Sequence, residues 1–455
     1  MYIAQHSCGD CREVFPELVE AGLQIYNTFQ PEVYDIEYFK ERFGDSITFY
    51  GGISTQKLLP YATPDELEKE MKRIIGILGK DGGYIISSTH AMPNDIPTEN
   101  VLKFVEVCKN QGGVMISFES DYTTGACPEI IKALTESNLE PETGYLEDRF
   151  CKSAARKIAD ACGDQDAQIY FAVGGTQANS LVIGASLKDY QGVIAANTGH
   201  IALHEGGAIE YTGHKVIGLG HELGKVRAQE LEDYLKTFYA DENNEKMVYP
   251  GMLHVSHPTE YGTLYTKAEL EELARICHEY GMQLYLDGAR LGYGLAARDT
   301  DVTLKDIYRI CDVFYIGGTK VGALCGEAIV YTKHNMPEHF RTIAKQRNAM
   351  LAKGRLLGIQ FDTLFTDGLY FELGKHAIDL AMKIKETFAA RGYKFLLDSP
   401  TNQQFVILED GFMNELKEKV GFAFWEKYDE NHTVVRFASS WSTTEEDLEY
   451  LFGLI

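Results

Sequence analysis

A single lysine stands at the end of an apolar run in "DVFYIGGTKVGALCGEA", residues 312–328. Lysine is almost never fully buried unless something compensates its charge. The plain interpretation is that Lys320 extends its ammonium group from the edge of the core to water. The alternative is a catalytic amine, because an apolar setting lowers a lysine pKa and makes a neutral nucleophile available.

A second stretch has the composition of an anion site. "YFAVGGTQANS" places Gly174, Gly175 and Thr176 between a predicted strand and the start of a predicted helix. The free N–H groups and the positive end of the helix dipole attract a phosphate there, and glycine lets it approach closely. The alternative is an ordinary strand-to-helix turn capped by Thr176.

Two further residues follow predicted strands. His200, in "AANTGHIALHEGGA", either lies flat on an aromatic ligand or is an ordinary loop histidine. Asp287, in "LYLDGARLGYG", stands at a strand's carboxyl end, where α/β proteins usually bind ligands and where a carboxylate can hold a cationic ring nitrogen. The alternative is that Asp287 caps the next turn and pairs with Arg290.

Together these features match what a pyridoxal 5'-phosphate (PLP) site requires. The phosphate needs the glycine turn, the ring needs a stacking histidine, and the aldehyde needs a lysine amine. An aspartate that keeps the ring nitrogen protonated makes the ring an electron sink. The combination favours catalysis at Lys320 over the plain interpretation.

Residues 114–455 resemble the threonine aldolase and β-eliminating lyase group of fold-type-I PLP enzymes. The resemblance is carried by "SDYTTGACPEI", "GGTQANS", "TGHI", "HPTEYGTLYT", "LYLDGARL" and "GGTKVGAL". It implies that Lys320 binds the cofactor aldehyde, Asp287 the ring nitrogen, His200 the ring face, and Gly175 with Thr176 the phosphate. It also implies a substrate carboxylate site made by Arg290, Arg436 and Ser120, and a homodimer or homotetramer.

The expected reaction is cleavage of a β-hydroxy-α-amino acid, threonine or allo-threonine, to glycine and an aldehyde. A base must remove the β-hydroxyl proton. Glu260, in "PTEYG", and His200 are the two candidates for that base. A PLP-dependent β-eliminating amino-acid lyase on the same scaffold stays open as an alternative.

The start of the chain carries a different set of residues. "HSCGDC" gives His6, Cys8 and Cys11, which suit Zn²⁺, a redox-active thiol pair or merely reduced cysteines. This block resembles the C-terminal part of the uroporphyrinogen decarboxylase and corrinoid methyltransferase superfamily through "HSCGD", "NTFQPE", "FGDSITFYGGIST" and "GGYIISSTHAMPNDIPTENV". The resemblance implies zinc on His6 and Cys8, with His90 near the third ligand position. A zinc-dependent methyl-transfer or metal-binding accessory protein is therefore an alternative of another class.

The elements that must position these residues form three parts. Residues 1–110 alternate about four strands with helices. The resemblance implies that they are a truncated (βα) fragment of a TIM barrel, which needs eight strands to close, so we expect no decarboxylase or methyltransferase activity from this chain alone. After a turn at 110–113, residues 114–364 alternate strands and amphipathic helices. This pattern is typical of a mostly parallel sheet with helices on both faces, and we expect it to form the large PLP-binding domain. Residues 365–455 form a small C-terminal α/β domain.

Composition excludes several partners. The 43 Lys and Arg against 67 Asp and Glu give a formal charge of −24, which opposes nucleic acid and anionic membrane surfaces. No apolar run is long enough to span a bilayer, and "MYIAQHSCGD" does not read as a signal peptide. With nine scattered cysteines that suit reduced thiols, we expect a cytoplasmic enzyme that acts on a small amino acid.

Overall fold

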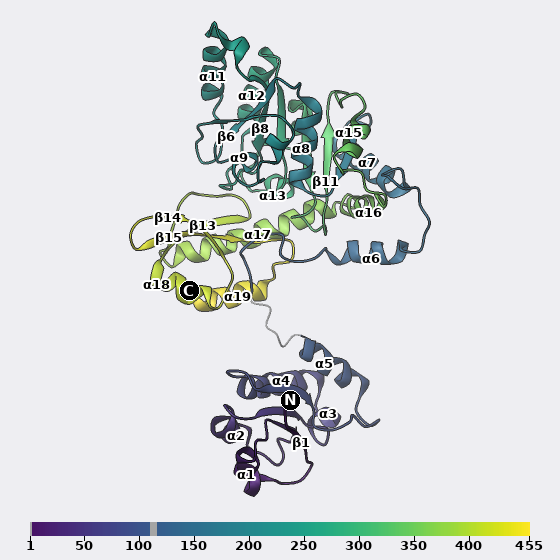
Figure 1. Cartoon of the computed structure of the whole chain (residues 1–455), viewed down its shortest axis with the longest axis vertical. Coiled ribbons are helices and arrows are strands. Elements are labelled where there is room, and N and C mark those ends of the chain that lie inside the picture. Colours follow the sequence, from purple (N-terminus) through teal and green to yellow (C-terminus); the bar gives the residue numbers. More distant parts are fainter. Residues whose placement is uncertain (1, 110–115) are drawn as a thin grey trace. The chain divides into compact units, whose positions relative to one another are not determined.

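The computed structural model describes residues 2–109 and 116–455 (Figure 1). The chain divides into two compact units, residues 1–114 and 115–455. The turn predicted at 110–113 lies outside the described residues.

The first unit is built on four parallel strands that neighbour one another in chain order. They are β1 (Ala4–His6), β2 (Ile25–Phe29), β3 (Thr48–Ile53) and β4 (Tyr84–Ser88). The helical segments are η1 (Arg12–Val14), α1 (Phe15–Glu20), α2 (Ile36–Phe43), α3 (Leu58–Tyr61), α4 (Pro64–Leu78) and α5 (Thr98–Lys109). Helix α4 begins with a capping box between Thr63 and Glu66.

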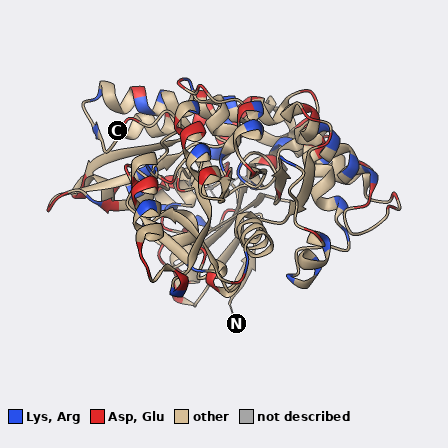
Figure 2. Ribbon diagram, turned by 90° about the horizontal axis from the view of Figure 1, so that it is seen from above, with Lys and Arg blue, Asp and Glu red and all other residues tan. Residues whose placement is uncertain are grey.

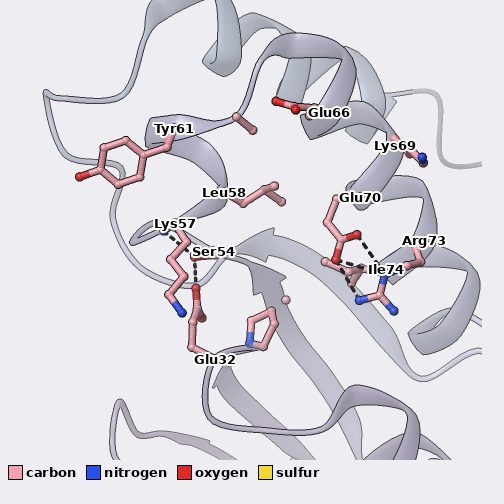
Figure 3. A pocket seen from close by; sticks show the side chains of 13 residues that line it. Glu32, Ser54, Lys57, Leu58, Tyr61, Glu66, Lys69, Glu70, Arg73 and Ile74 are labelled. Carbon is pink, nitrogen blue, oxygen red and sulfur yellow. Dashed lines mark hydrogen bonds and ion pairs between the residues drawn. The ribbon is translucent and has the colours of Figure 1, made fainter.

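One groove of about 770 Å³ lies on this unit beside α3 and α4 (Figure 3). Its wall carries charges of both signs, among them the ion pair of Glu70 with Arg73. Ser54 donates a hydrogen bond to Glu32 at the other side of the groove. This groove is larger than the cavity that holds the residues predicted for PLP, described below, but contains none of them.

The second unit contains a sheet of seven strands in the order β5-β11-β10-β9-β8-β6-β7. The neighbours pair in parallel except β11, which runs antiparallel to β10 and β5, so the predicted mostly parallel sheet is confirmed. The strands are β5 (Gln168–Ala172), β6 (Gln191–Ala196), β7 (Val216–Leu219), β8 (Tyr249–Ser256), β9 (Gln283–Asp287), β10 (Val313–Gly317) and β11 (Glu327–Tyr331). Strands β10 and β11 are buried along their whole length, which explains why their sequences are apolar apart from Glu327 at the start of β11.

Helices alternate with these strands along the chain (Figure 1). They are α6 (Pro128–Ser137), α7 (Arg149–Cys162), α8 (Gly175–Ser186), α9 (His200–Leu203), α10 (Ala208–Tyr211), α11 (Ala228–Ala240), η2 (Asn244–Lys246), α12 (Lys267–Glu279), α13 (Leu291–Ala296), α14 (Leu304–Ile310), α15 (Phe340–Gln346) and α16 (Arg355–Leu364). Short turns that join a strand to the next helix carry polar residues of the candidate active site described below.

The end of the chain adds an antiparallel sheet of order β12-β13-β15-β14. Its strands are β12 (Lys394–Phe395), β13 (Gln403–Glu409), β14 (Ala423–Lys427) and β15 (His432–Ala438), with helices α17 (Leu369–Ala390), α18 (Asp410–Lys417) and α19 (Glu445–Leu454). Phe118 packs into the core of this part, and Ser117 bridges to Gly421. Residues assigned by sequence to the large domain thus pack with the small one.

Charged residues of both signs alternate along the surface helices (Figure 2). On α12, for example, Arg275 pairs with Glu272 and Glu279. In the part of the chain that the structure describes, no helix is long and apolar enough to cross a membrane.

Candidate active site

Seven of the residues predicted for PLP and substrate line one cavity of about 180 Å³ in the second unit. It lies where β5, β8, β9 and β10 end and the following turns begin. The seven are Gly175, Thr176, His200, Glu260, Asp287, Arg290 and Lys320.

The glycine turn at the mouth of this cavity begins a long helix. Gly174 is the N-cap of α8, and Gly175 is its first residue. The first N–H groups of a helix have no partner inside it, so this end offers donors and a positive dipole to an anion. A Cβ on Gly175 would lie 3.0 Å from the Tyr315 hydroxyl, so only glycine fits without displacing that tyrosine.

Asp287 is the most firmly held carboxylate of the site. It is buried, and it accepts hydrogen bonds from the Tyr315 hydroxyl, the Ala289 N–H and the Asn179 amide. His254 Nε2 lies 3.5 Å from Asp287 Oδ2. Burial raises the pKa of Asp287, but the nearby His254, the charge of His200 and the Tyr315 donor outweigh it and lower the pKa. Asp287 is therefore an anion ready to bind a cationic ring nitrogen.

A buried polar network joins Asp287 to His200. Asn179 donates to both Asp287 and Glu205, at 3.0 and 2.7 Å, and accepts from the Tyr285 hydroxyl. Glu205 in turn lies 2.8 Å from His200 Nδ1. Burial lowers the pKa of His200, but the Glu205 hydrogen bond and the charges of Asp287 and Glu205 raise it overall. The network fixes the imidazole at the cavity wall.

Lys320 is half-buried in the same cavity, and its Nζ lies 5.9 Å from the ring centre of Tyr122. Burial lowers the pKa of Lys320, and the positive charge of Arg290 adds to this effect. The amine therefore loses its proton more readily than a surface lysine, as the sequence interpretation required.

The turn that carries Lys320 is clamped by a buried acid. Glu327 accepts hydrogen bonds from the Thr319 hydroxyl at 2.8 Å and from the Gly318 N–H at 3.2 Å. Burial raises the pKa of Glu327 to about 8. A protonated carboxyl group thus lines the cavity next to the lysine.

Glu260 is held at the cavity by one of its oxygens. Glu260 Oε1 accepts from the Ser256 hydroxyl at 2.8 Å and from the His200 N–H at 2.9 Å. Among the described residues, Oε2 of Glu260 has no hydrogen-bond partner. That oxygen is therefore able to receive a proton.

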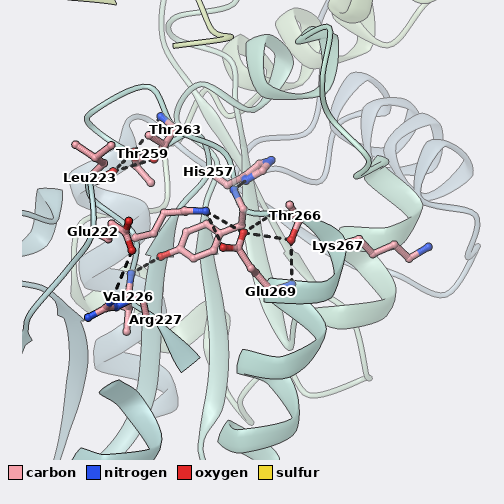
Figure 4. A network of polar contacts seen from close by, with 12 residues as sticks. Glu222, Leu223, Val226, Arg227, His257, Thr259, Thr263, Thr266, Lys267 and Glu269 are labelled. Atoms are coloured by element: carbon pink, nitrogen blue, oxygen red, sulfur yellow. Dashed lines mark hydrogen bonds and ion pairs between the residues drawn. The ribbon is translucent and has the colours of Figure 1, made fainter. Parts of the chain in front are cut away.

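A polar network next to Glu260 supports its turn (Figure 4). The Thr259 and Thr263 hydroxyls are 2.7 Å apart, and both donate to the carbonyl of Leu223. Further along, Thr266 forms a capping box with Glu269 at the start of α12. Lys225 donates to Glu269 and ties the preceding loop to this helix.

The predicted carboxylate site differs among its three members. Arg290 forms a bidentate ion pair with the buried Asp121, at 2.7 and 3.0 Å, rather than pairing with Asp287. Arg436 donates to Gln403 and to the Glu119 carbonyl, while its Nε is buried without a hydrogen-bond partner. The Ser120 hydroxyl is likewise buried and unpartnered. Arg436 is thus the less neutralised of the two guanidinium groups.

A second hollow adjoins the first and shares His200, Glu260, Arg290 and Lys320 with it. Its other side comes from Tyr122 and from the small antiparallel sheet, which contributes Phe424, Trp425 and Arg436. The inner cavity contains the residues for a cofactor, and the outer hollow has room and a cation for an amino acid.

The residues present fit PLP. An N-terminal helix end for the phosphate, an ionised buried carboxylate for the ring nitrogen and a lysine of lowered pKa all line one cavity. His200, predicted to lie on the ring, lines the same cavity and is held by Glu205.

The first unit brings its three predicted ligands together. His6, Cys8 and His90 each offer one ligand atom, and these atoms lie within 4.8 Å of one another. His6 Nδ1 lies 2.6 Å from Asn27 Oδ1, which orients the ring and turns Nε2 toward Cys8. Cys11 instead contacts Ser7. The three ligands are exposed.

Several residues of the site were not predicted from the sequence. Asp121, Asn179 and Tyr315 lie far from their partners along the chain, so no local pattern indicates them. Glu327 stands within the same stretch as Lys320, and an acid at the start of an otherwise apolar strand is the signal that could have indicated it.

The second unit is similar to known proteins. A model of the β-eliminating lyase family matches residues 117–396. A low specificity L-threonine aldolase of Pseudomonas aeruginosa is 29% identical over 337 residues, covering 73% of this chain and 95% of the relative. A solved structure of threonine aldolase from Leishmania major has a TM-score of 0.72 and 38% identity, covering 74% of this chain and 98% of that one.

The second unit therefore has the fold of the fold-type-I PLP enzymes, as predicted. The chain belongs to the β-eliminating lyase family, and threonine aldolases are among its relatives.

The first unit matches a different family. A model of uroporphyrinogen decarboxylase matches residues 1–111. The uroporphyrinogen decarboxylase of Pseudoalteromonas atlantica is 32% identical over 72 residues, which are 16% of this chain and 20% of that relative. The predicted resemblance is confirmed, and this chain spans about one fifth of that relative.

Proposed function

We propose that this protein is a PLP-dependent aldolase that cleaves threonine or allo-threonine to glycine and acetaldehyde. The observation that carries the proposal is the convergence of Lys320, Asp287 and the start of α8 on one cavity. The adjoining hollow presents Arg436 and Glu260 to a substrate. The family and the threonine aldolase relatives support the same reaction.

PLP, when bound, supplies an electron sink for the negative charge that develops at the substrate α-carbon. Lys320 would bind its aldehyde, Asp287 its ring nitrogen and the Gly175–Thr176 turn its phosphate. His200 would cover one face of the ring. Because Asp287 is anionic and buried, it keeps a proton on the ring nitrogen.

The chain's own residues then bind the substrate and move its protons. Arg436 has an unpartnered buried N–H for the substrate carboxylate, and the unpartnered Ser120 hydroxyl is a second donor. Glu260 Oε2 takes the proton of the β-hydroxyl group as the bond between Cα and Cβ breaks and the aldehyde leaves. Cα then receives a proton, which balances the one taken from the hydroxyl group, and the product leaves as glycine.

Glu260 is the better candidate for the base. His200 Nδ1 is engaged by Glu205, and the ring is fixed for stacking. Glu260 keeps one oxygen unbonded while two donors hold the other. His200 also contributes its backbone N–H to Glu260, so the two candidates act in one unit.

A product assay distinguishes cleavage from β-elimination, the rival reaction on this scaffold. The full-length protein is loaded with PLP and given threonine, allo-threonine or serine, and glycine, acetaldehyde and ammonia are measured. Cleavage gives glycine and acetaldehyde in equal amounts from both threonine isomers or one of them. Ammonia without glycine would contradict the proposal.

A second proposal concerns the first unit, where His6, Cys8 and His90 would bind Zn²⁺. Imidazole and thiolate are ligands that Zn²⁺ prefers. The side-chain oxygen of Asn27 contacts Nδ1 of His6 and so orients the imidazole ring whose Nε2 would bind the metal. Three protein ligands leave one position of a tetrahedral site for water or a thiol substrate. A metal-binding or methyl-transfer accessory role would use that open position.

Metal analysis tests this site. We expect one zinc per chain after dialysis, lost in Cys8→Ser and kept in Cys11→Ser, since Cys11 lies outside the cluster. A metal-free wild-type protein after zinc loading, or equal loss in both variants, would contradict it.

We also place the protein in the cytoplasm as a homodimer or homotetramer, following the family resemblance. The aromatic rings of Tyr122 and Phe424 are exposed at the outer hollow, which supports an assembly in which another copy of the chain covers this hollow.

A further inference from the structure

The parallel sheet of the first unit has one open face. Tyr26 and Phe49 point to the other face and are fully buried. On the open face, Asn27 pairs with Tyr50, and Tyr50 pairs with Ile85, so one row of side chains crosses the sheet. Tyr50 is 37% and Ile85 43% exposed. Parallel sheets are almost always covered on both faces, so an apolar open face calls for a partner.

This face is hollowed near the amino ends of the strands. Ile25, Thr48 and Ile85 come from three neighbouring strands and line a hollow of about 540 Å³ together with Tyr2.

Among the described residues, neither β1 nor β4 has a strand neighbour on its outer side. Strand β1 reads "AQH" and β4 reads "YIISS", without the proline, lysine or other charged residues that normally keep an edge from pairing. Apolar side chains are also exposed on the helices that follow the two edge strands in the chain: Val14 ends η1 after β1, and Leu102 and Val105 lie on α5 after β4. Each edge thus has the hydrogen-bonding groups and the apolar flank for another strand and its helix.

We propose that a second copy of this chain covers the open face, so that β4 of each copy pairs in parallel with β1 of the other. Four strands from each copy give the eight that close a barrel of this kind. A two-fold axis along the barrel keeps all strands parallel and makes the two junctions identical. The open face then becomes the barrel interior, and α5 of one copy lies beside α1 of the other.

Cross-linking of isotope-mixed chains tests this arrangement. Full-length ¹⁴N and ¹⁵N chains are mixed, allowed to exchange and treated with a carbodiimide, which joins a lysine to a carboxylate. We expect mixed-isotope peptides that join Lys103 or Lys109 of α5 to Glu17 or Glu20 of α1. Within one unit, β1 and β4 are opposite edges of the sheet, so these peptides report contact between copies.

Two variants and one independent measurement complete the test. Ile85→Lys places a charge on the open face and should lower the yield of mixed peptides at least about tenfold, because a buried unpaired ammonium is costly. Tyr38→Lys, on the outer helix α2, is the control and should leave the yield unchanged. Hydrogen exchange should show the amides of β1 and β4 protected in the purified wild type and exposed in Ile85→Lys. Edge amides that exchange freely in the wild type, or the absence of mixed peptides, would overturn the proposal and point to a different chain as the partner.

Discussion

At the scale of single residues, the site depends on how burial sets the charge of neighbouring groups. Lys320 and Glu327 line the same cavity, and burial shifts the pKa of each toward its neutral form. A neutral lysine is a nucleophile, and a neutral carboxyl group beside it does not hold a proton on it by charge attraction. The Thr319 and Gly318 contacts make Glu327 a positioning residue for the lysine turn.

Glu327→Gln should change how stability depends on pH. Burial raises the pKa of Glu327 to about 8, so the folded state binds this proton more tightly than the unfolded state. The free energy of unfolding of the wild type therefore falls as pH rises from about 5 toward 8. The variant cannot lose this proton and should show a shallower decline in urea unfolding across that range. An identical slope would show that Glu327 is already ionised at pH 5.

Glu260→Gln should lower kcat for threonine cleavage by about 10²–10⁴ while leaving PLP bound, because the amide cannot accept the hydroxyl proton. The amide keeps an oxygen for the Ser256 and His200 donors, so the turn should hold its shape. Glu222→Gln is the control, because Glu222 is an exposed glutamate that does not line the cavity. Activity retained in Glu260→Gln and lost in His200→Phe would reassign the base to His200.

The individual residues were predictable where a local pattern carried them. Lys320, Asp287 and the glycine turn each stand at the end of an apolar strand. Their residue types, together with this position in the sequence, were enough to predict them. Arg290 shows the limit. Its sequence neighbours do not reveal that Asp121, distant along the chain, accepts hydrogen bonds from its Nε and Nη2.

At the scale of elements, strand ends and helix starts place the chemistry. The seven strands of the large sheet were predictable because buried parallel strands are continuously apolar, and turns with glycine or proline separate them. The segment around Phe118 was not predictable from the sequence, because the stretch that bridges to Gly421 is too short to give a periodic signal.

Gly175→Ala should weaken PLP binding at the start of α8 by about tenfold or more. Its Cβ would lie 3.0 Å from the Tyr315 hydroxyl, which is bonded to Asp287, so both the phosphate turn and the ring-nitrogen contact would shift. Gly453→Ala, on α19 with no atom within 4 Å of the new Cβ, is the matched control. PLP titration followed by absorbance measures both. Unchanged affinity in Gly175→Ala would show that the phosphate binds elsewhere.

At the scale of the whole molecule, the chain joins two units with separate cores. The sequence indicated two blocks through their different motifs. It could not show which face of the first sheet stays open, because that depends on how the strands lie in space rather than on the types of their residues.

The two units should work independently in the aldolase reaction. Cys8→Ser should remove the proposed zinc but leave kcat/KM for threonine within about twofold, because Lys320, Asp287 and Arg436 all lie in the second unit. A steady-state assay of the metal-free variant checks this. A large loss of cleavage would mean that the first unit contributes to the active site.

The central claim is that Lys320 holds PLP in the cavity shared with Asp287. The most direct measurement is reduction of the PLP-loaded full-length protein with borohydride, which fixes lysine-bound PLP as pyridoxyl-lysine, followed by peptide mapping. We predict one labelled lysine, Lys320, and no label in Lys320→Ala, while the exposed Lys132→Ala labels as the wild type does. Label on another lysine, or undiminished label in Lys320→Ala, would contradict the assignment.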